Sequence, residues 1–95
     1  MNTLSVVHDV LRRQVREGDF CIDATAGKGR DTALLCRLTG ENGRVLAFDV
    51  QEDAVRQTRE LLAKEHLSAE VYLDRHANMA RYAEPETVDC IVFNF

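Results

Sequence analysis

The apolar residues near the start of the chain follow a helical period. They recur three and four positions apart, so they share one face of a predicted helix that ends before Gly18: Leu4, Val7, Leu11 and Val15. The same kind of spacing predicts a helix from Asp31 to a stop at Gly40, one beginning with Glu52, and a short one over residues 77–82. The chain is therefore expected to contain amphipathic helices joined by short connections.

Short apolar runs between these helices have the length of strands. Residues 20–22 and 45–48 are apolar without alternation, which is typical of parallel strands covered on both faces. Residues 70–73 alternate enough for an edge strand, and residues 88–93 form the last run. Strands that alternate with helices predict a parallel sheet with right-handed crossovers. We expect an α/β fold with strand order 3-2-1-4 and helices on both faces.

Each predicted strand is followed by a polar side chain at its carboxyl end: Asp23, Asp49, Asp74 and Asn94. In open parallel sheets, ligands bind at the carboxyl ends of the strands, beside the point where the strand order reverses. In this sheet that point lies between the first and fourth strands. The pattern predicts a binding site built from residues that are far apart in the sequence.

Composition restricts the class of protein. Hydrophobic residues make up 45% of the chain and charged residues 29%, which is typical of a single globular domain over residues 1–95. The 16 acidic residues outnumber the 12 Lys and Arg, so the net charge of −4 does not attract phosphate backbones to the molecule as a whole. The sequence contains neither an apolar run of the ~20 residues that span a membrane nor a signal sequence. A cytoplasmic protein without a membrane partner is expected.

The cysteines and histidines suggest no metal site. Cys21, Cys36 and Cys90 are widely spaced, with no Cys-x-x-Cys pair and no zinc-type pattern. Reduced, buried thiols are expected, and a redox role is the alternative. His8 is expected to be packed or solvated beside the first apolar stripe, and His66 to be exposed at a helix end.

The loop over residues 27–29 has the pattern Gly-x-Gly, which suits either a dinucleotide or S-adenosylmethionine. Its glycines are expected to adopt positive φ and to let the chain approach the ligand closely. A dinucleotide site needs a further small residue where this sequence has Thr32, and its pyrophosphate would lie between Asp23 and Asp31. Like charges a few Å apart cost on the order of a few kcal/mol. S-adenosylmethionine carries an ammonium and a sulfonium and no phosphate, so these acids favour it.

The strand-end acids have alternative interpretations. Asp49 follows Gly27 by 22 positions and could accept both ribose hydroxyl hydrogens, or it could cap the next helix ahead of Gln51. Asp23 could bind the ligand, stabilise the loop through backbone N–H groups, or do both. Asp74 could accept a hydrogen from an adenine amino group or be an exposed acid.

Segments of the sequence resemble the class I S-adenosylmethionine-dependent methyltransferases. They are residues 22–32 (Ile-Asp-Ala-Thr-Ala-Gly-Lys-Gly-Arg-Asp-Thr), 47–51 (Ala-Phe-Asp-Val-Gln), 74–78 (Asp-Arg-His-Ala-Asn) and 92–94 (Val-Phe-Asn). Within this class, the chain is similar over essentially its whole length to the YtqB-like rRNA methylases, a group associated with methylating the aminomethyl group of a modified wobble uridine in tRNA. The resemblance implies a Rossmann-like methyltransferase fold, S-adenosylmethionine as cofactor, and tRNA or rRNA as substrate.

The resemblance also implies roles for single residues. The loop from Asp23 to Gly29 would hold the methionine end of the cofactor, Asp49 and Gln51 the ribose and adenine, and Asp74 with His76 the far rim. His76 and Asn94 would be catalytic, with His76 able to accept a proton from an amine nucleophile. The expected cofactor-binding residues are therefore Asp23, Thr25, Gly27, Lys28, Gly29, Asp49, Gln51, Asp74 and His76.

The sequence departs from this group in two places. Lys28 and Arg30 replace the usual Asn and His, and with Arg75 they could meet RNA phosphates or could be scattered surface charge. Relatives continue beyond the final Asn through a further loop and more strands, whereas this sequence stops at Phe95. We expect a cofactor-binding amino-terminal portion, truncated after strand 4 and inactive alone, whose apolar last strand invites pairing with a second copy.

Three functional classes remain open on the sequence alone. An S-adenosylmethionine-dependent methyltransferase acting on RNA is the leading one. A cofactor-binding module without its own catalysis is the alternative. A dinucleotide-binding oxidoreductase is disfavoured by Asp23, Asp31 and Thr32.

Overall fold

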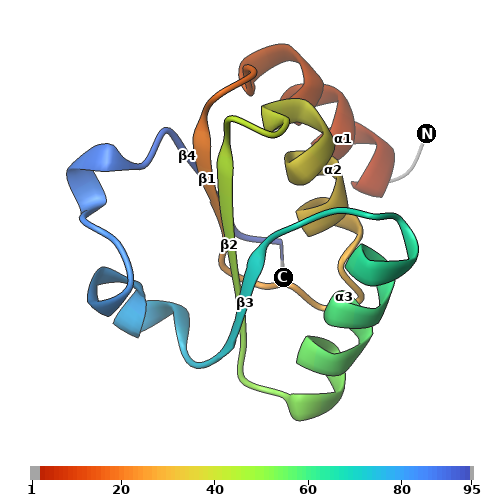
Figure 1. Ribbon diagram of the computed structural model, residues 1–95, viewed down its shortest axis with the longest axis vertical. Helices are drawn as coiled ribbons and strands as arrows, with labels where there is room; N and C mark the ends of the chain where they lie inside the picture. The colour runs from red at the N-terminus through yellow and green to blue at the C-terminus, as the bar shows by residue number, and fades with distance from the viewer. Residues whose placement is uncertain (1–2, 95) are drawn as a thin grey trace.

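The computed structural model describes residues 3–94 and shows helices packed on a central sheet (Figure 1). In chain order the elements are α1 Thr3–Gln14, β1 Phe20–Asp23, α2 Arg30–Thr39, β2 Arg44–Asp49, α3 Glu52–Lys64, β3 Glu70–Leu73, the 3₁₀ helices η1 His76–Arg81 and η2 Pro85–Thr87, and β4 Cys90–Val92. None of the helices in this part of the chain has the length and apolar character that crossing a membrane requires.

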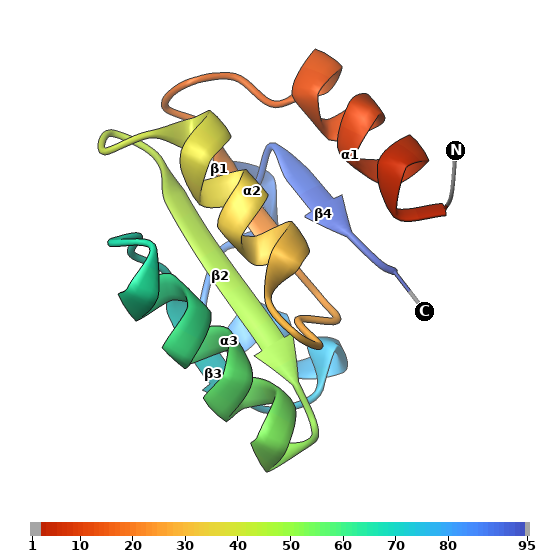
Figure 2. The same ribbon diagram turned by 90° about the vertical axis from the view of Figure 1, so that its right-hand side faces the viewer.

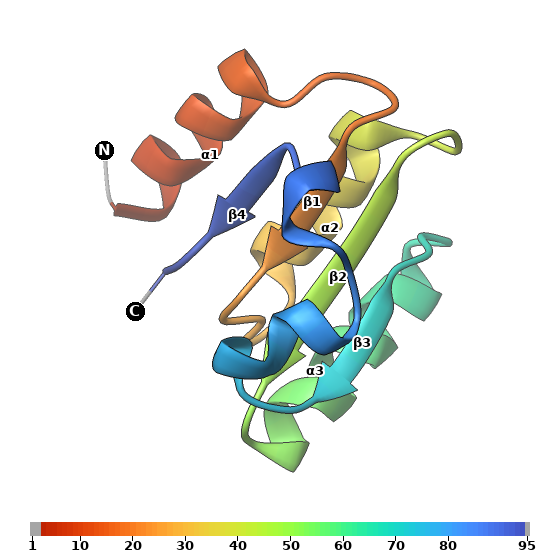
Figure 3. The same cartoon turned by 90° about the vertical axis from the view of Figure 1, so that its left-hand side faces the viewer.

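The sheet has the predicted topology. Its strands are all parallel and lie in the order β3-β2-β1-β4. β1 is therefore central, and the chain reverses direction across the sheet between β1 and β4. All strands end at the same edge, where the loops after β1, β2 and β3 begin (Figure 3). This confirms the expected strand order and places the carboxyl ends of the strands together.

The two faces of the sheet are covered differently. α1, α2 and α3 all lie on one face, and η1 and η2 lie on the other (Figures 1 and 2). For α2, α3, η1 and η2, which lie in the connections between strands, the handedness of parallel crossovers explains this division. The connections from β1 to β2 and from β2 to β3 step in one direction along the sheet, whereas the connection from β3 to β4 steps back, so it must cross the opposite face. The expected cover on both faces is present, with only short 3₁₀ helices on the second face.

Alternate residues of each strand feed two separate hydrophobic clusters. Because successive side chains of a strand point to opposite faces, neighbours in sequence pack in different layers. The cluster under the α-helices includes Cys21, Val45, Ala47, Val71 and Val92 from the strands. The cluster under η1 and η2 is built on Ile22, Leu46 and Phe48, against which Tyr72, Met79 and Tyr82 pack.

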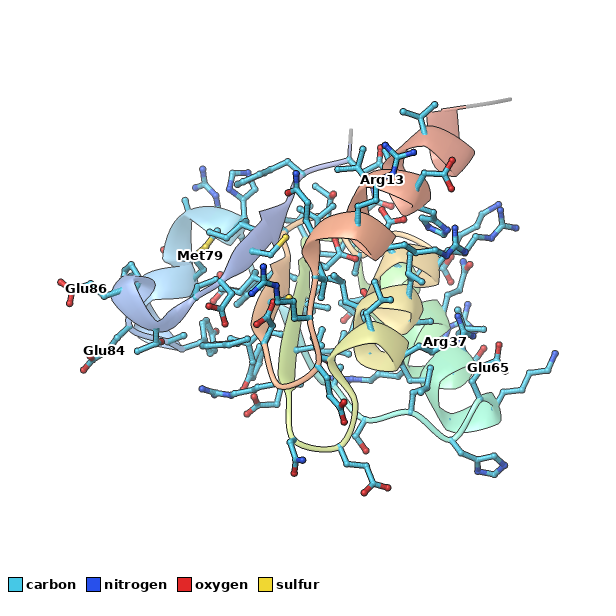
Figure 4. The ribbon with its side chains drawn as sticks, turned by 90° about the horizontal axis from the view of Figure 1, so that it is seen from above. Arg13, Arg37, Glu65, Met79, Glu84 and Glu86 are labelled. Atoms are coloured by element: carbon cyan, nitrogen blue, oxygen red, sulfur yellow. The ribbon has the colours of Figure 1, made fainter. Side chains whose placement is uncertain are left out.

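Local signals explain where the helices begin and end. α2 begins after Gly29 and ends at Gly40, and both glycines have positive φ. α3 carries Glu52 and Asp53 in its first turn, which complements the helix dipole. An ion pair of 2.8 Å between Arg37 and Glu65 joins the ends of α2 and α3 at the surface (Figure 4).

Two elements differ from their predicted form. The helix expected over residues 77–82 is the 3₁₀ helix η1, His76–Arg81. The last strand is Cys90–Val92 and not residues 88–93. Pro85 begins η2, and Val88 N–H donates to its carbonyl, so Val88 is not available to the sheet. Asp89 extends the pairing instead, since its carboxylate accepts Phe20 N–H at 2.8 Å.

The buried positions of two thiols and the exposure of the helix-end histidine match expectation, whereas Cys90 is only partly buried. Cys21, Cys36 and Cys90 are free cysteines, the first two buried. Burial raises the pKa of Cys21 to about 12 and that of Cys36 to about 11. Such thiols remain protonated and unreactive at neutral pH. His66 is exposed just beyond the end of α3.

Candidate functional site

Two hollows lie side by side at the carboxyl edge of the sheet. One has a volume of roughly 170 Å³ and is lined by Thr25, Ala26, Gly27, Lys28, Arg30, Asp31 and Asn94. The other has a volume of roughly 300 Å³ and is lined by Ala24, Thr25, Asp49, Val50, Asp74 and His76. Thr25 lines both, so the two hollows are neighbours and together make up the candidate site.

Asp23 supports the loop from inside. Its side chain is fully buried. Thr25 N–H donates to Oδ1 at 3.1 Å, and the Thr32 hydroxyl donates to Oδ2 at 2.7 Å. Burial raises the pKa of Asp23 to about 6 against the opposing effect of these hydrogen bonds. The loop-stabilising contacts considered above are therefore present, and the binding of a ligand by Asp23 stays a prediction.

The loop glycines have the expected backbone, but Gly29 has a different close neighbour. The φ angles are 56° at Gly27 and 90° at Gly29, which confirms the predicted positive values. A Cβ added to Gly29 would lie 2.9 Å from Thr58 Cα. A close approach to α3 thus requires glycine at position 29, and the expected close approach of the loop to a ligand stays a prediction.

Thr58 is a loop-supporting residue that the sequence interpretation missed. It is fully buried on α3, and its hydroxyl donates to the Gly27 carbonyl at 3.2 Å. Its signal in the sequence is a polar residue within the apolar stripe that includes Val55 and Leu62, both of which are buried. The hydroxyl of Thr58 thereby couples α3 to the Gly-x-Gly turn.

Asp49 presents a carboxylate that the protein only half uses. Gly27 N–H donates to Oδ2 at 3.0 Å, and Gln51 N–H donates to Oδ1 at 3.0 Å. Each oxygen keeps further capacity to accept a hydrogen bond. Asp49 is partly exposed, and its neighbour Val50 is 64% exposed beside the larger hollow. Asp49 therefore orders the start of α3 and faces the hollow at once.

Asp74 is strongly bound within its own segment. Its carboxylate accepts hydrogen bonds from Arg75 N–H at 2.7 Å, Asn78 Nδ2 at 2.8 Å and the Tyr82 hydroxyl at 2.5 Å. The hydrogen bond from Tyr82 is the largest of the effects that lower the pKa of Asp74 to about 2. Asp74 lines the larger hollow, but most of its acceptor capacity is spent on ordering η1.

His76, Gln51 and Lys28 complete the set of predicted residues at this edge. The imidazole of His76 lines the larger hollow and packs edge-on against the Phe93 ring, with centroids 5.2 Å apart. Lys28 is exposed beside the smaller hollow. Gln51 is exposed at the start of α3 and lines neither hollow.

Asn94 is held through both its main chain and its side chain. Asn94 N–H donates to the Thr25 hydroxyl oxygen at 2.8 Å, and Asn94 Nδ2 donates to Asp31 Oδ2 at 2.9 Å. Asp31 also receives a hydrogen bond from His8 Nε2 on its other oxygen, at 2.8 Å. The expectation that His8 is packed or solvated is refined, because it contacts a residue of the candidate site.

A more voluminous hollow elsewhere on the surface is a poorer candidate site. It measures roughly 700 Å³ and lies against α3 and Leu73. Most of the charges that line it are already engaged: Arg56 pairs with Asp53 and Glu60, and Arg59 donates to the Val71 carbonyl at 2.7 Å. On a shallow surface whose charges already have partners, a small ligand gains little binding free energy over its contacts with water.

Comparisons with known proteins point to one class of enzyme. The family model described as "Putative rRNA methylase" matches residues 45–95, more than half of the chain. A chloroplastic tRNA (mnm(5)s(2)U34)-methyltransferase of Arabidopsis thaliana is 32% identical over 94% of the chain and 36% of its own length. The ubiquinone/menaquinone biosynthesis C-methyltransferase UbiE of Klebsiella pneumoniae is 34% identical over 85% of the chain and 32% of its own length.

Solved structures give the same picture. A protein described as a putative rRNA-methylase from Clostridium thermocellum superposes with a TM-score of 0.84 at 42% identity, over 88% of this chain and 48% of that one. SMU.1697c of Streptococcus mutans, described as a putative methyltransferase in complex with SAH, superposes with a TM-score of 0.77 at 34% identity. That match covers 87% of this chain and 46% of the other.

The matches differ in how much of each partner they cover. The chain spans about a third of the length of the curated relatives and about half of the solved structures. Within that span the Rossmann-like fold agrees throughout, with the strand order described above. By its match to the family model over more than half of its residues, the chain belongs to the rRNA methylase family of methyltransferases.

Proposed function

We propose that the joined hollows at the carboxyl edge bind S-adenosylmethionine and that the protein is a methyltransferase that modifies RNA. The observation that carries the proposal is the arrangement around Thr25. The partly exposed carboxylate of Asp49 lines one hollow, and Asp31 lines the other. A ligand with vicinal hydroxyls at one end and a cationic centre at the other suits both carboxylates, and S-adenosylmethionine has this form.

The larger hollow fits the adenosine end. The remaining acceptor capacity of Asp49 suits the two ribose hydroxyls, which donate hydrogen bonds. Val50, at 64% exposure, offers an apolar contact to the face of an adenine ring. Gln51, just beyond, is proposed to reach the adenine edge. Asp74 and His76 line the far side of the same hollow.

The smaller hollow fits the methionine end. Thr25, Gly27 and Lys28 line it from the loop, and Asp31 supplies negative charge. The same charge opposes a dinucleotide pyrophosphate, which carries two negative charges. Asp23 and Gly29 are buried and are proposed to act by holding the loop in shape, together with Thr32 and Thr58.

The reaction places few demands on the protein's own groups. S-adenosylmethionine, when bound, supplies a methyl group already activated by its sulfonium. The protein must then position a neutral nucleophile and accept the proton it releases. His76 is proposed to accept this proton, and Asn94 to hold the nucleophile through its amide. Both residues line hollows of the same edge.

RNA is proposed as the substrate because of the relatives' names. The family is described as rRNA methylase, and the Arabidopsis relative as a tRNA methyltransferase. Lys28, Arg30 and Arg75 are exposed around the rim and could contact phosphates despite the net charge of −4. The UbiE relative makes C-methylation of a quinone the second candidate.

Calorimetric titration with S-adenosylmethionine, S-adenosylhomocysteine and NAD tests the cofactor assignment. We expect the first two to bind and NAD not to bind. Asp49→Ala should lower the affinity for S-adenosylhomocysteine about 10- to 100-fold, as expected for loss of charge-assisted hydrogen bonds worth ~1.5 to 3 kcal/mol. Asp9→Ala is the matched control, because Asp9 is an exposed acid that pairs only weakly with Arg12 at 3.4 Å. Unchanged affinity in a folded Asp49→Ala protein would remove Asp49 from the site.

Incubation with labelled S-adenosylmethionine tests the substrate. The assay uses a version of the protein extended over the additional length that its relatives have. We expect the labelled methyl group to enter undermodified tRNA or rRNA. Transfer to a quinone precursor, with none to RNA, would favour the second candidate instead.

A further inference from the structure

His8 belongs to a junction of three elements beside the smaller hollow. It lies on α1, Asp31 lies in the first turn of α2, and Asn94 follows β4. His8 Nε2 lies 2.8 Å from Asp31 Oδ1, and Asn94 Nδ2 lies 2.9 Å from Asp31 Oδ2. α1 packs beside α2, which brings the histidine to this position (Figure 2).

The junction is largely removed from solvent. The side chain of Asp31 is 7% exposed and that of His8 is 17% exposed. Hydrogen bonds between such shielded groups are stronger than those of exposed pairs. Each oxygen of the Asp31 carboxylate accepts one donor, and together the donors fix its orientation. Removing His8 frees one of these oxygens and allows the carboxylate to rotate.

The orientation of Asp31 determines that of the Asn94 amide. A carboxylate only accepts hydrogen bonds, so the amide must turn its NH₂ group toward Asp31. Its carbonyl oxygen then points away from Asp31. The Asn94 main chain cannot follow a rotation of the side chain, because its N–H is held by the Thr25 hydroxyl at 2.8 Å. Among residues 3–94, no hydrogen bond uses Asn94 Oδ1, and Asn94 lines the smaller hollow.

We propose that His8 is a positioning residue, which acts through Asp31 to present Asn94 Oδ1 as an acceptor for an amine or ammonium N–H. The proposal rests on the proposed cofactor site. The N–H donor has two sources with the same chemistry: the α-ammonium of the cofactor's methionine end, or the amine nucleophile that receives the methyl group. In either case α1, which contributes no lining residue to the hollow, takes part in the function of the site.

Ligand affinities distinguish the sources without a measurement of activity. S-adenosylhomocysteine contains the α-ammonium, and 5′-methylthioadenosine lacks the whole amino-acid arm. Sinefungin carries an amine where S-adenosylmethionine carries its sulfonium methyl group. The affinity ratio of S-adenosylhomocysteine to 5′-methylthioadenosine reports on the α-ammonium. The ratio of sinefungin to S-adenosylhomocysteine reports on an amine at the transferred methyl.

The variants are His8→Ala, His8→Gln, Asn94→Ala and the double variant His8→Ala with Asn94→Ala. We expect His8→Ala and Asn94→Ala to lower one of the two ratios by about 10- to 100-fold, the loss typical of a hydrogen bond to a charged group. His8→Gln should retain most of the ratio, because its amide N–H can still donate to Asp31. The double variant should lose no more than Asn94→Ala alone, since both changes act on one acceptor.

His66→Ala is the matched control, because this histidine is exposed at the end of α3. It should leave both ratios unchanged. Thermal unfolding accompanies each titration, and His8→Gln and Asn94→Ala keep the test valid if His8→Ala does not fold. The role of His8 would be overturned by a folded His8→Ala variant that binds 5′-methylthioadenosine and keeps both affinity ratios of the unsubstituted protein. Failure of the unsubstituted protein to bind any of the three ligands would overturn the cofactor site itself.

Discussion

An aspartate ends β1 and another directly follows β3, at the starts of the β1–α2 and β3–β4 segments, and the two carboxylates have opposite environments. Asp23 is fully buried, and burial raises its pKa to about 6. Asp74 lies at the surface of the rim, and its hydrogen bonds, led by that from Tyr82, lower its pKa to about 2. The residue type and the position at a strand end are the same. The surroundings decide whether the ionised carboxylate is disfavoured, as at Asp23, or stabilised, as at Asp74.

The contrast extends to the two segments as a whole. The β1–α2 loop is held by buried hydroxyls, those of Thr32 and Thr58, on the face that the α-helices cover. The β3–β4 connection is held by surface groups and by an aromatic stack, with Tyr82 and Tyr72 centroids 4.2 Å apart. Rigidity in the first segment suits the proposed role of this loop in presenting backbone N–H groups to the cofactor. We expect the second segment to tolerate substitution better.

The largest expected effect comes from Gly29→Val. The new side chain would collide with the Thr58 backbone, since even a Cβ lies only 2.9 Å from Thr58 Cα, and the φ of 90° is unfavourable for valine. We expect loss of cooperative thermal unfolding by circular dichroism. The comparison variant is Gly27→Ala, whose Cβ has its nearest neighbour at 3.9 Å. It should cost only about 1 to 2 kcal/mol for the left-handed backbone. Equal stability of the two variants would contradict the packing argument.

Asp23→Ala should have the next largest effect on stability. It leaves the buried Thr32 hydroxyl and Thr25 N–H without their acceptor, but it also removes the cost of burying a charge. The net loss should be about 2 kcal/mol in the free energy of unfolding, measured in urea. Asp74→Ala should lose less than half as much, because its partners can turn to water. A larger loss for Asp74→Ala would reverse the proposed contrast.

The same pair of aspartates should shape the dependence of stability on pH. The folded-state pKa of Asp23, about 6, lies above its ordinary value of 3.8. The native state then binds more protons, so the free energy of unfolding should fall as pH rises from 3.8 to about 6. For Asp74 the folded-state pKa is about 2, so stability should be lost as pH falls from 3.8 to about 2.

Urea unfolding at a series of pH values measures both effects. Asp23→Asn should remove the fall in the free energy of unfolding between pH 3.8 and about 6, and keep the loss of stability below pH 3.8. Asp74→Asn should do the reverse. A pH profile of Asp23→Asn that overlays that of the unsubstituted protein between pH 4 and 6 would show that Asp23 does not titrate in the range inferred from its burial.

The sequence predicts the topology of the fold better than the contacts that each side chain makes. Strand order, the positive φ of Gly27 and Gly29, and the gathering of Asp49, Asp74 and Asn94 at one edge follow from periodicity and the rules of parallel sheets. The close contact between Gly29 and Thr58 could not be predicted, because it depends on how closely α3 packs against the loop. Such distances between elements leave no trace in local spacing.

For the polar residues, too, the position in the chain is predictable and the long-range contacts are not. That Asp23 would end a strand is readable from the apolar run before it, but its burial depends on a hydroxyl nine positions later in α2. The link from His8 through Asp31 to Asn94 joins the two ends of the chain, and no motif encodes it. The short form of β4 depends on Asp89 replacing a ladder hydrogen bond, which strand propensity does not capture.

The smallest expected effect comes from Tyr82→Phe, which isolates one of the bonds that hold Asp74. Phenylalanine keeps the ring that packs against Phe48, at a centroid distance of 5.2 Å, and against Tyr72. Only the hydroxyl that donates to Asp74 Oδ2 is lost. Because this bond is the largest cause of the lowered pKa, the pKa of Asp74 should move back toward 3.8 while Asn78 and Arg75 N–H still hold it below that value. An NMR titration of the Asp74 carboxyl carbon measures the shift, with Tyr72→Phe as the control because its hydroxyl contacts Glu70 and not Asp74. If Tyr82→Phe leaves the pKa of Asp74 in place, the hydroxyl is not what stabilises this ion, and the contrast with Asp23 must rest on the Asn78 and Arg75 donors and on exposure to water.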